Sequence, residues 1–215
     1  MKTKQLKFQA HKIVVDSDIK LNLTITADTN LDCHSLACEY PESNITFSEN
    51  CCDGVATIMV KNDSKSLSAA FTKEWSLNIT LASTLPEFLL NAANVATDFS
   101  SGTISDIKCN FATGKMVLHE GVEFVTAKLD SAKGNYKIAV PKCFEHLAIN
   151  SAIGKIALAL PTTAYIKCSQ KRLMKCEEQI FGQPGADCTE PKTIDVQGAL
   201  LTTSIICNTI KGVTP

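Results

Sequence analysis

The chain of 215 residues has no surplus of charge of either sign, because 21 Lys and Arg stand against 22 Asp and Glu and the formal net charge is −1. A protein that binds nucleic acid through its phosphates needs an excess of cations to displace counterions. The charge balance therefore argues against nucleic acid as a partner. The sequence also lacks any run approaching the roughly 20 apolar residues that cross a bilayer, so we expect no transmembrane segment.

The start of the sequence does not predict an export signal. Met1–Phe8 has the basic opening of a signal peptide, but Gln9, His11, Lys12 and Asp16 interrupt the apolar stretch that should follow. The chain as written is therefore expected in the cytoplasm, and at the cell surface if a leader has been removed.

Cysteine is too sparse for a disulfide scaffold, although the chain has ten. Several cysteines take an apolar position in an alternating segment, as Cys109 does within Ile107–Phe111 and Cys207 does after Ile205. A free cysteine in such a position behaves as a small hydrophobic residue. We therefore expect most of the cysteines to be reduced, buried thiols, which suits a reducing compartment.

The sequence does contain an internal repeat. Glycines stand at positions 114, 134 and 154, and their neighbours keep the same spacing of 20 residues. Equivalent apolar positions are Cys109, Leu129 and Ile149; Met116, Tyr136 and Ile156; and Leu118, Ile138 and Leu158. Alternating apolar positions indicate strands, and glycine supplies the backbone freedom for a turn. Such a unit buries its apolar face only by stacking on its neighbours, so we predict an all-β fold, a β-solenoid or roll of two-strand units of about 20 residues.

The remainder of the chain is also rich in strand patterns. Ile13–Val15, Lys20–Thr26, Val55–Val60 and Trp75–Leu81 carry β-branched residues with partial alternation. We interpret them as antiparallel strands that extend the solenoid. Leu85–Asn94 has some helical propensity, but its strand-rich surroundings favour an extended chain.

The segment 168–192 interrupts the repeat. Within it, Lys171–Phe181 has the composition of a helix with Leu173, Cys176 and Ile180 on one face. A loop of this length is often functional. We therefore predict a single all-β domain over residues 1–215, divided into N-terminal strands (1–84), the repeat region (85–165), a cysteine-containing insertion (166–192) and final strands (193–215).

The order of these segments resembles a known family. Ala56–Asn62 leads to the strand Trp75–Leu81 and a Leu-Pro step at 85–86, and Ser-Gly or Ala-x-Gly turns then precede short strands. These turns lie at 101–104, 131–134 and 151–154. The succession resembles the bacterial domain-of-unknown-function family 4097, the "putative adhesin" domain, over about residues 10 to 165, with a return at 193–213. The resemblance implies an all-β, solenoid-like fold and adhesin-type binding, with no catalytic residues to carry over.

Metal binding by cysteine is one chemical alternative. Cys33, His34 and Cys38 precede the adjacent Cys51 and Cys52, but this spacing lacks the paired Cys-x2-Cys knuckles of zinc sites. A second group consists of Cys168, Cys176 and Cys188, with Glu177, Glu178 and Asp187 nearby. We favour reduced thiols in the first group and either free thiols or one tethering disulfide in the second, and we assign no metal, cofactor or catalytic residue.

Enzymatic chemistry has little support in the sequence. A catalytic cysteine needs a nearby base, usually histidine, and the histidines are His11, His34, His119 and His146. His119 and His146 fall at turn-like positions that suit solvated polar residues. No Gly-x-Ser-x-Gly elbow, phosphate-binding loop or His-Glu-x2-His helix is present. We expect that the protein is not an enzyme, although carboxylates along a solenoid groove leave that alternative open.

The sequence thus predicts a non-catalytic binding or scaffolding module with a protein or glycan partner. A flat sheet face or an open terminal strand would make the contact. Two alternatives stay open: an intracellular regulatory or envelope-stress accessory protein on the same fold, and a metal- or redox-linked protein that uses the cysteine clusters.

Overall fold

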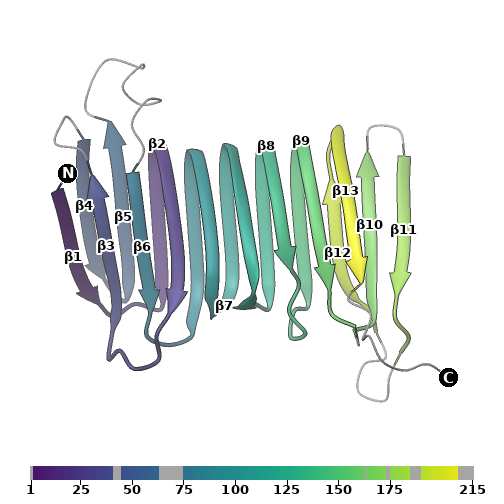
Figure 1. The fold of residues 1–215 in the computed structure, drawn as a ribbon, viewed down its shortest axis with the longest axis horizontal. Helices are drawn as coiled ribbons and strands as arrows, with labels where there is room; N and C mark the ends of the chain where they lie inside the picture. Colours follow the sequence, from purple (N-terminus) through teal and green to yellow (C-terminus); the bar gives the residue numbers. More distant parts are fainter. Residues whose placement is uncertain are drawn as a thin grey trace.

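The chain forms a row of strands that belong to one large mixed sheet (Figure 1). The computed structural model describes residues 2–40, 45–62, 75–162, 164–172, 175–184 and 190–207. The strands are β1 (Lys2–Phe8), β2 (Lys12–Ala27), β3 (His34–Tyr40), β4 (Ile45–Cys52), β5 (Val55–Asn62), β6 (Trp75–Leu81), β7 (Leu85–Glu123), β8 (Thr126–Ala139), β9 (His146–Leu160), β10 (Ile166–Arg172), β11 (Lys175–Phe181), β12 (Lys192–Gln197) and β13 (Leu200–Cys207). The all-β prediction is confirmed, and the described residues include no helix that could cross a bilayer.

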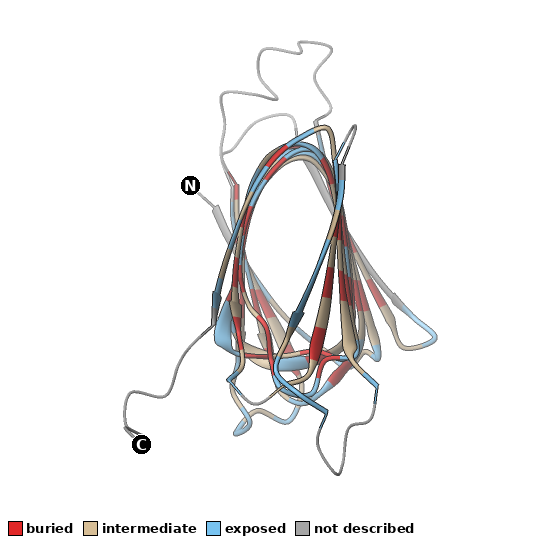
Figure 2. Cartoon of the chain, turned by 90° about the vertical axis from the view of Figure 1, so that its right-hand side faces the viewer, coloured by how far each residue is buried: buried red, intermediate tan, exposed pale blue. Residues whose placement is uncertain are grey.

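The long central strands bend and belong to two facing layers. Seen along the row, the layers join at the top of the view (Figure 2). The pairing locates one of these bends: β9 pairs with β12 through His146–Asn150 and with β13 through Ile153–Leu160. The bend of β9 therefore falls at Ser151 and Ala152.

The central strands are parallel, and their register follows the spacing seen in the sequence. Strands β7, β8 and β9 pair so that each residue faces one 20 positions along the chain, as Cys109, Leu129 and Ile149 do. Because the side-chain period of a strand is two, this register keeps equivalent apolar residues such as Cys109, Leu129 and Ile149 together on the inner face. Columns of apolar side chains therefore run across the strands between the layers.

The core lies between the two layers. Its largest fully buried side chains include Trp75, Phe88, Phe99, Phe124 and Phe144. Phe88 and Phe99 meet edge to face, with ring centroids 5.4 Å apart. Each such side chain contributes about 1.5–3 kcal/mol when it leaves water, so the apolar columns provide the main stabilising term.

The N-terminal strands differ from the prediction in direction. Strand β2 runs parallel to β5, β6 and β7, whereas antiparallel pairs join β1 to β3, β3 to β6 and β4 to β5. The expectation of a wholly antiparallel N-terminal part is therefore wrong. The connections differ accordingly: a short turn joins β4 to β5 and reverses the chain, whereas longer excursions join β2 to its parallel partners.

The predicted helix over Lys171–Phe181 is also wrong. Strand β10 ends at Arg172, and β11 pairs antiparallel with it from Lys175 to Phe181. An exposed edge of β10 would leave unpaired backbone N–H and C=O groups, which a neighbouring strand satisfies and a helix does not. Leu173, which was expected on the helix face, lies outside the described residues.

The strand order near the C-terminus departs from the chain order. Strand β12 lies between β9 and β10 and is parallel to both. The chain thus forms the hairpin β10–β11 first in sequence and returns afterwards to the position beside β9.

Close approach of the neighbouring backbone requires glycine at position 154. Gly134 and Gly154 are partners in the register of β8 and β9. A Cβ added to Gly154 would lie 1.7 Å from the carbonyl oxygen of Gly134, and Gly154 has a φ of +157°. Both the space and the backbone conformation therefore select glycine at Gly154.

Candidate functional site: a groove across the strands

A broad depression lies along the bends of the central strands. It has a volume of about 870 Å³ and opens broadly to solvent. We call it the bend groove and define it by its lining residues, which are Asn91, Ala92, Asn110, Phe111, Ala112, Asp130, Ser131, Ala132, Asn150, Ser151, Ala152, Gln197 and Gly198. Because it runs across the strands, each strand contributes equivalent positions to it.

A row of amides and one carboxylate forms one side of the bend groove. Asn110, Asp130, Asn150 and Gln197 are consecutive partners in the registers of β7, β8, β9 and β12. Neighbouring strands lie about 4.8 Å apart, so the row presents one polar side chain at each such step. Asn91, from the first part of β7, continues it toward β2.

Some members of this row bond to one another and others are free. The Asn150 amide donates to Asp130 at 2.6 Å, and the Asn91 amide donates to Asp16 at 2.7 Å. Asn110 and Gln197 are exposed, and in the described part of the chain their side chains have no hydrogen-bond partner. The groove therefore offers two unengaged amides, each with donor and acceptor capacity.

A hydroxyl network fixes the shape of the groove beneath the row. The Ser131 hydroxyl donates to Ser151 at 2.8 Å and accepts from the Tyr136 hydroxyl at 2.9 Å. Ser151 also accepts from the Gly134 N–H at 3.1 Å. Burial raises the pKa of Tyr136, so this phenol stays protonated and donating. The network ties neighbouring strands together where they bend.

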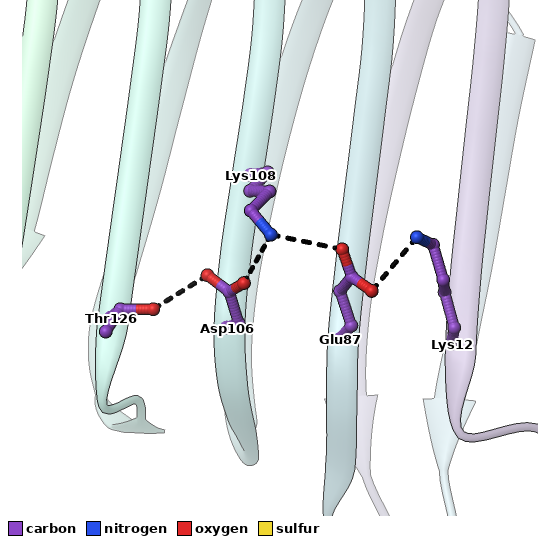
Figure 3. A network of polar contacts seen from close by, with 5 residues as sticks. All are labelled: Lys12, Glu87, Asp106, Lys108 and Thr126. Atoms are coloured by element: carbon purple, nitrogen blue, oxygen red, sulfur yellow. Dashed lines mark hydrogen bonds and ion pairs between the residues drawn. The ribbon is translucent and has the colours of Figure 1, made fainter.

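A second polar surface lies on the outer face of strands β2, β7 and β8. Glu87 joins Lys12 at 2.9 Å to Lys108 at 3.2 Å, and Lys108 also reaches Asp106 at 2.5 Å (Figure 3). Thr126 donates to the other oxygen of Asp106 at 2.7 Å. The network thus links side chains from β2, β7 and β8.

The charges in this network shift one another's proton affinity. The hydrogen bond from Lys12 lowers the pKa of Glu87, and Lys108 adds to that effect. Burial acts to raise the pKa of Asp106, but the hydrogen bonds from Lys108 and Thr126 outweigh it and the pKa is lowered. All these groups stay partly exposed, and each exposed ion pair stabilises a fold by only about 0.2–1 kcal/mol. Because every charge here has a partner, we regard the network as structural.

The first cysteine group does not assemble as a metal site in the described residues. His34 is buried, its Nε2 lies 3.1 Å from the Ala10 carbonyl oxygen, and the Ala82 N–H donates to its Nδ1 at 3.1 Å. Both ring nitrogens are therefore occupied by the backbone. Cys38 is fully buried, and burial raises its pKa to about 11. The described residues contain no group of three or more His, Cys, Asp or Glu side chains able to hold a metal; the side chain of Cys51 lies outside them.

The second cysteine group is divided by the sheet. Cys168 is buried on the inner face of β10 and pairs with Gln179, whereas Cys176 is exposed and lies an odd number of residues from Gln179. Side chains at odd spacing along a strand point to opposite faces, so the two thiols are on opposite sides. Cys188 lies outside the described residues.

The other described cysteines divide between core and surface. Cys109 is buried, as its alternating position predicts, and burial raises its pKa. Cys52 and Cys143 are exposed and Cys33 is half-buried, so the expectation that most cysteines are buried is wrong for the described ones. Cys33 and Cys143 lie between strands and Cys52 is the last residue of β4, so all three stand where the alternating pattern ends.

The two histidines expected at solvated positions are on outward faces. His119 Nε2 lies 3.2 Å from Asp98, and His146 Nδ1 lies 2.6 Å from the Thr193 hydroxyl. Their side chains are 49% and 45% exposed, and neither contacts a described cysteine. Neither of these two histidines is therefore placed to act as the base of a described cysteine.

The polar row of the bend groove was missed by the sequence reasoning. The signal was present, since Asn110, Asp130 and Asn150 follow one another at the 20-residue spacing. This polar column directly follows the apolar positions Cys109, Leu129 and Ile149, from which the strands were predicted. Gln197 could not have been added, because nothing local in the sequence indicates that β12 lies beside β9.

Comparison with known proteins establishes the class of fold and no more. No family profile matches the sequence, and no curated protein matches it. The chain is similar in structure to a putative cell adhesion protein from Clostridium sporogenes, with a TM-score of 0.53 and 13% sequence identity, over 96% of this chain and 99% of that chain. A putative adhesin from Bacteroides fragilis gives a TM-score of 0.46 and 14% identity, over 96% of this chain and 97% of that chain. The protein is thus an all-β chain with a large mixed sheet, whose fold is similar to that of the first of these structures.

Proposed function

We propose that this protein is a non-catalytic binding module of the adhesin type, with its strands coiled as a β-solenoid and the bend groove as its contact surface. The observation that carries the proposal is the pair of unengaged amides, Asn110 and Gln197, in an open groove on bonded strands. Polar groups held on a rigid sheet bind a partner without the entropic cost of ordering a loop. The name of the similar Clostridium structure supports the same role.

A binding role suits the groove better than hydrolysis does. Its lining contains a single carboxylate, Asp130, and that carboxylate accepts a hydrogen bond from Asn150. Hydrolysis of a glycosidic bond ordinarily uses two carboxylates on opposite sides of the scissile bond. The groove lining does not supply that pair, so we assign no catalytic role to it.

The test measures binding of purified cell-surface glycans and extracellular-matrix proteins to the immobilised protein by interferometry. The double variant Asn110→Ala/Gln197→Ala should lose the ligand that the wild-type protein binds. Gln179→Ala is the matched control, because Gln179 is an exposed amide on β11 outside the groove. Retained binding in the double variant would show that the groove is not the contact surface. Products found by mass spectrometry after incubation would contradict the non-catalytic role.

A further inference from the structure

The chemistry of the bend groove narrows the ligand to one class. We propose that the groove binds a linear, uncharged polysaccharide that lies across the strands, with successive sugar units meeting successive strands. The proposal rests on the binding function stated above and adds the identity of the ligand class. Three features of the groove support it: its spacing, its charge and its alanine strip.

The spacing of the polar row matches an extended polysaccharide. Asn110, Asp130, Asn150 and Gln197 stand on four adjacent strands, which are about 4.8 Å apart. One sugar ring of an extended polysaccharide is about as long as one strand spacing, so each ring can face one side chain. An extended peptide advances about 3.3 Å per residue, and its side chains fall out of step with the strands. The row therefore favours a glycan over a peptide.

The charge of the groove favours an uncharged ligand. No Lys or Arg is among its lining residues, and the nearby Lys128 is paired with Asp130, so the lining itself offers a polyanion no cation to replace its counterions. The one lining carboxylate, Asp130, already accepts from Asn150 at 2.6 Å and has Lys128 at 3.7 Å. Asn110 and Gln197 keep both a carbonyl oxygen and an amide N–H₂ for the ligand. Sugar hydroxyls donate and accept together, which is what these amides require.

An apolar strip runs beside the polar row. Ala112, Ala132 and Ala152 are exposed and follow the row two residues further along their strands, and Ala92 extends the strip. Small side chains leave a flat surface on which the C–H faces of sugar rings can lie. The only aromatic side chain in the lining, Phe111, is 5% exposed, so no ring is available for stacking. Each sugar unit therefore contributes little, and affinity should rise with the length of the chain.

The test titrates the protein with hexasaccharides by calorimetry. The panel contains β-1,4-linked glucose, mannose, xylose and N-acetylglucosamine (extended and neutral), α-1,4-linked glucose (coiled and neutral) and a hyaluronan fragment (extended and anionic). We expect binding to at least one extended neutral hexasaccharide, weaker binding to its tetrasaccharide, and weaker or no binding to the coiled and anionic compounds. Asn110→Ala and Gln197→Ala should each reduce affinity about two- to tenfold, the equivalent of one hydrogen bond, whereas Gln179→Ala should leave it unchanged.

Two outcomes would overturn the proposal while separating it from the binding function. If every extended neutral hexasaccharide fails to bind, yet the Asn110→Ala/Gln197→Ala variant loses a protein ligand, the groove binds but its ligand is not a polysaccharide. If the hyaluronan fragment or the coiled glucan binds as tightly as the extended neutral compounds, the arguments from charge or spacing are wrong. If affinity survives both groove substitutions, the site lies elsewhere and the binding function of the groove fails as well.

Discussion

Replacement of Gly154 by alanine should destabilise the protein strongly. The added Cβ would lie 1.7 Å from the Gly134 carbonyl oxygen, far inside contact distance, and the neighbouring strand is held there by its own ladder. Overpacking of this kind costs about 1–3 kcal/mol. The φ of +157° at Gly154 adds about 1–3 kcal/mol for a residue with a side chain. We expect a combined loss of about 3 kcal/mol.

This loss translates into a measurable thermal shift. For a chain of this length, 1 kcal/mol lowers Tm by about 2–4 °C, so Gly154→Ala should unfold about 6–12 °C earlier. Thermal unfolding followed by far-ultraviolet circular dichroism measures the shift. Gly121→Ala is the matched control, because a Cβ at Gly121 would lie 3.0 Å from its nearest atom, the Ser100 carbonyl oxygen. Equal midpoints for the two variants would refute the close approach of β8 and β9.

Three further predictions concern charge, thiols and the sheet edge. Lys108→Ala should lower the free energy of unfolding, measured in urea at neutral pH, by less than about 1 kcal/mol. Because Glu87 has a lowered pKa, this difference from wild type should vanish as the pH falls through that pKa. A difference that stays constant with pH would contradict the network. A thiol reagent at pH 8 should modify exposed Cys52 in the native protein, but it should modify Cys38, with its pKa near 11, only after unfolding. Peptide mass spectrometry identifies the modified cysteines, and modification of Cys38 before Cys52 would contradict the prediction. Leu200→Lys should leave the thermal unfolding midpoint unchanged and reduce the light scattering that reports aggregation. The reason is that Leu200 is 68% exposed on a strand without charged residues. A midpoint lowered by several degrees would mean that the Leu200 side chain is buried in solution.

The apolar pattern of the sequence predicted much of the central sheet. The strand-rich surroundings of Leu85–Asn94 favoured an extended chain over a helix, and that segment is the start of β7. The 20-residue spacing of Cys109, Leu129 and Ile149 corresponds to the observed pairing. These features are readable because burial of alternate residues on parallel strands forces one register.

Features set by distant partners could not be read in the same way. Lys171–Phe181 has helix-forming residues, but part of it pairs with β10. The hydrogen bonds that it makes to the backbone at the edge of β10 outweigh its local helical preference. The direction of the N-terminal strands and the position of β12 depend on connections that leave no local pattern. For the bend groove, the sequence contained part of the polar column and the turn at 151–154, where β9 bends, but it did not indicate Gln197.

The position of β12 between β9 and β10 has a consequence for the order of folding. Apart from its hairpin partner β11, β10 is bonded in the described sheet only to β12, which comes later in the chain. The β10–β11 hairpin therefore cannot join the sheet until β12 has been synthesised and docked on β9. That docking pairs residues 47 apart, as Thr193 and His146 are, whereas β8 and β9 pair residues 20 apart. The entropic cost of closing the longer loop is only about 0.8 kcal/mol greater. The late addition of the β10–β11 hairpin is therefore set by the order in which the strands are synthesised and not by this difference in free energy.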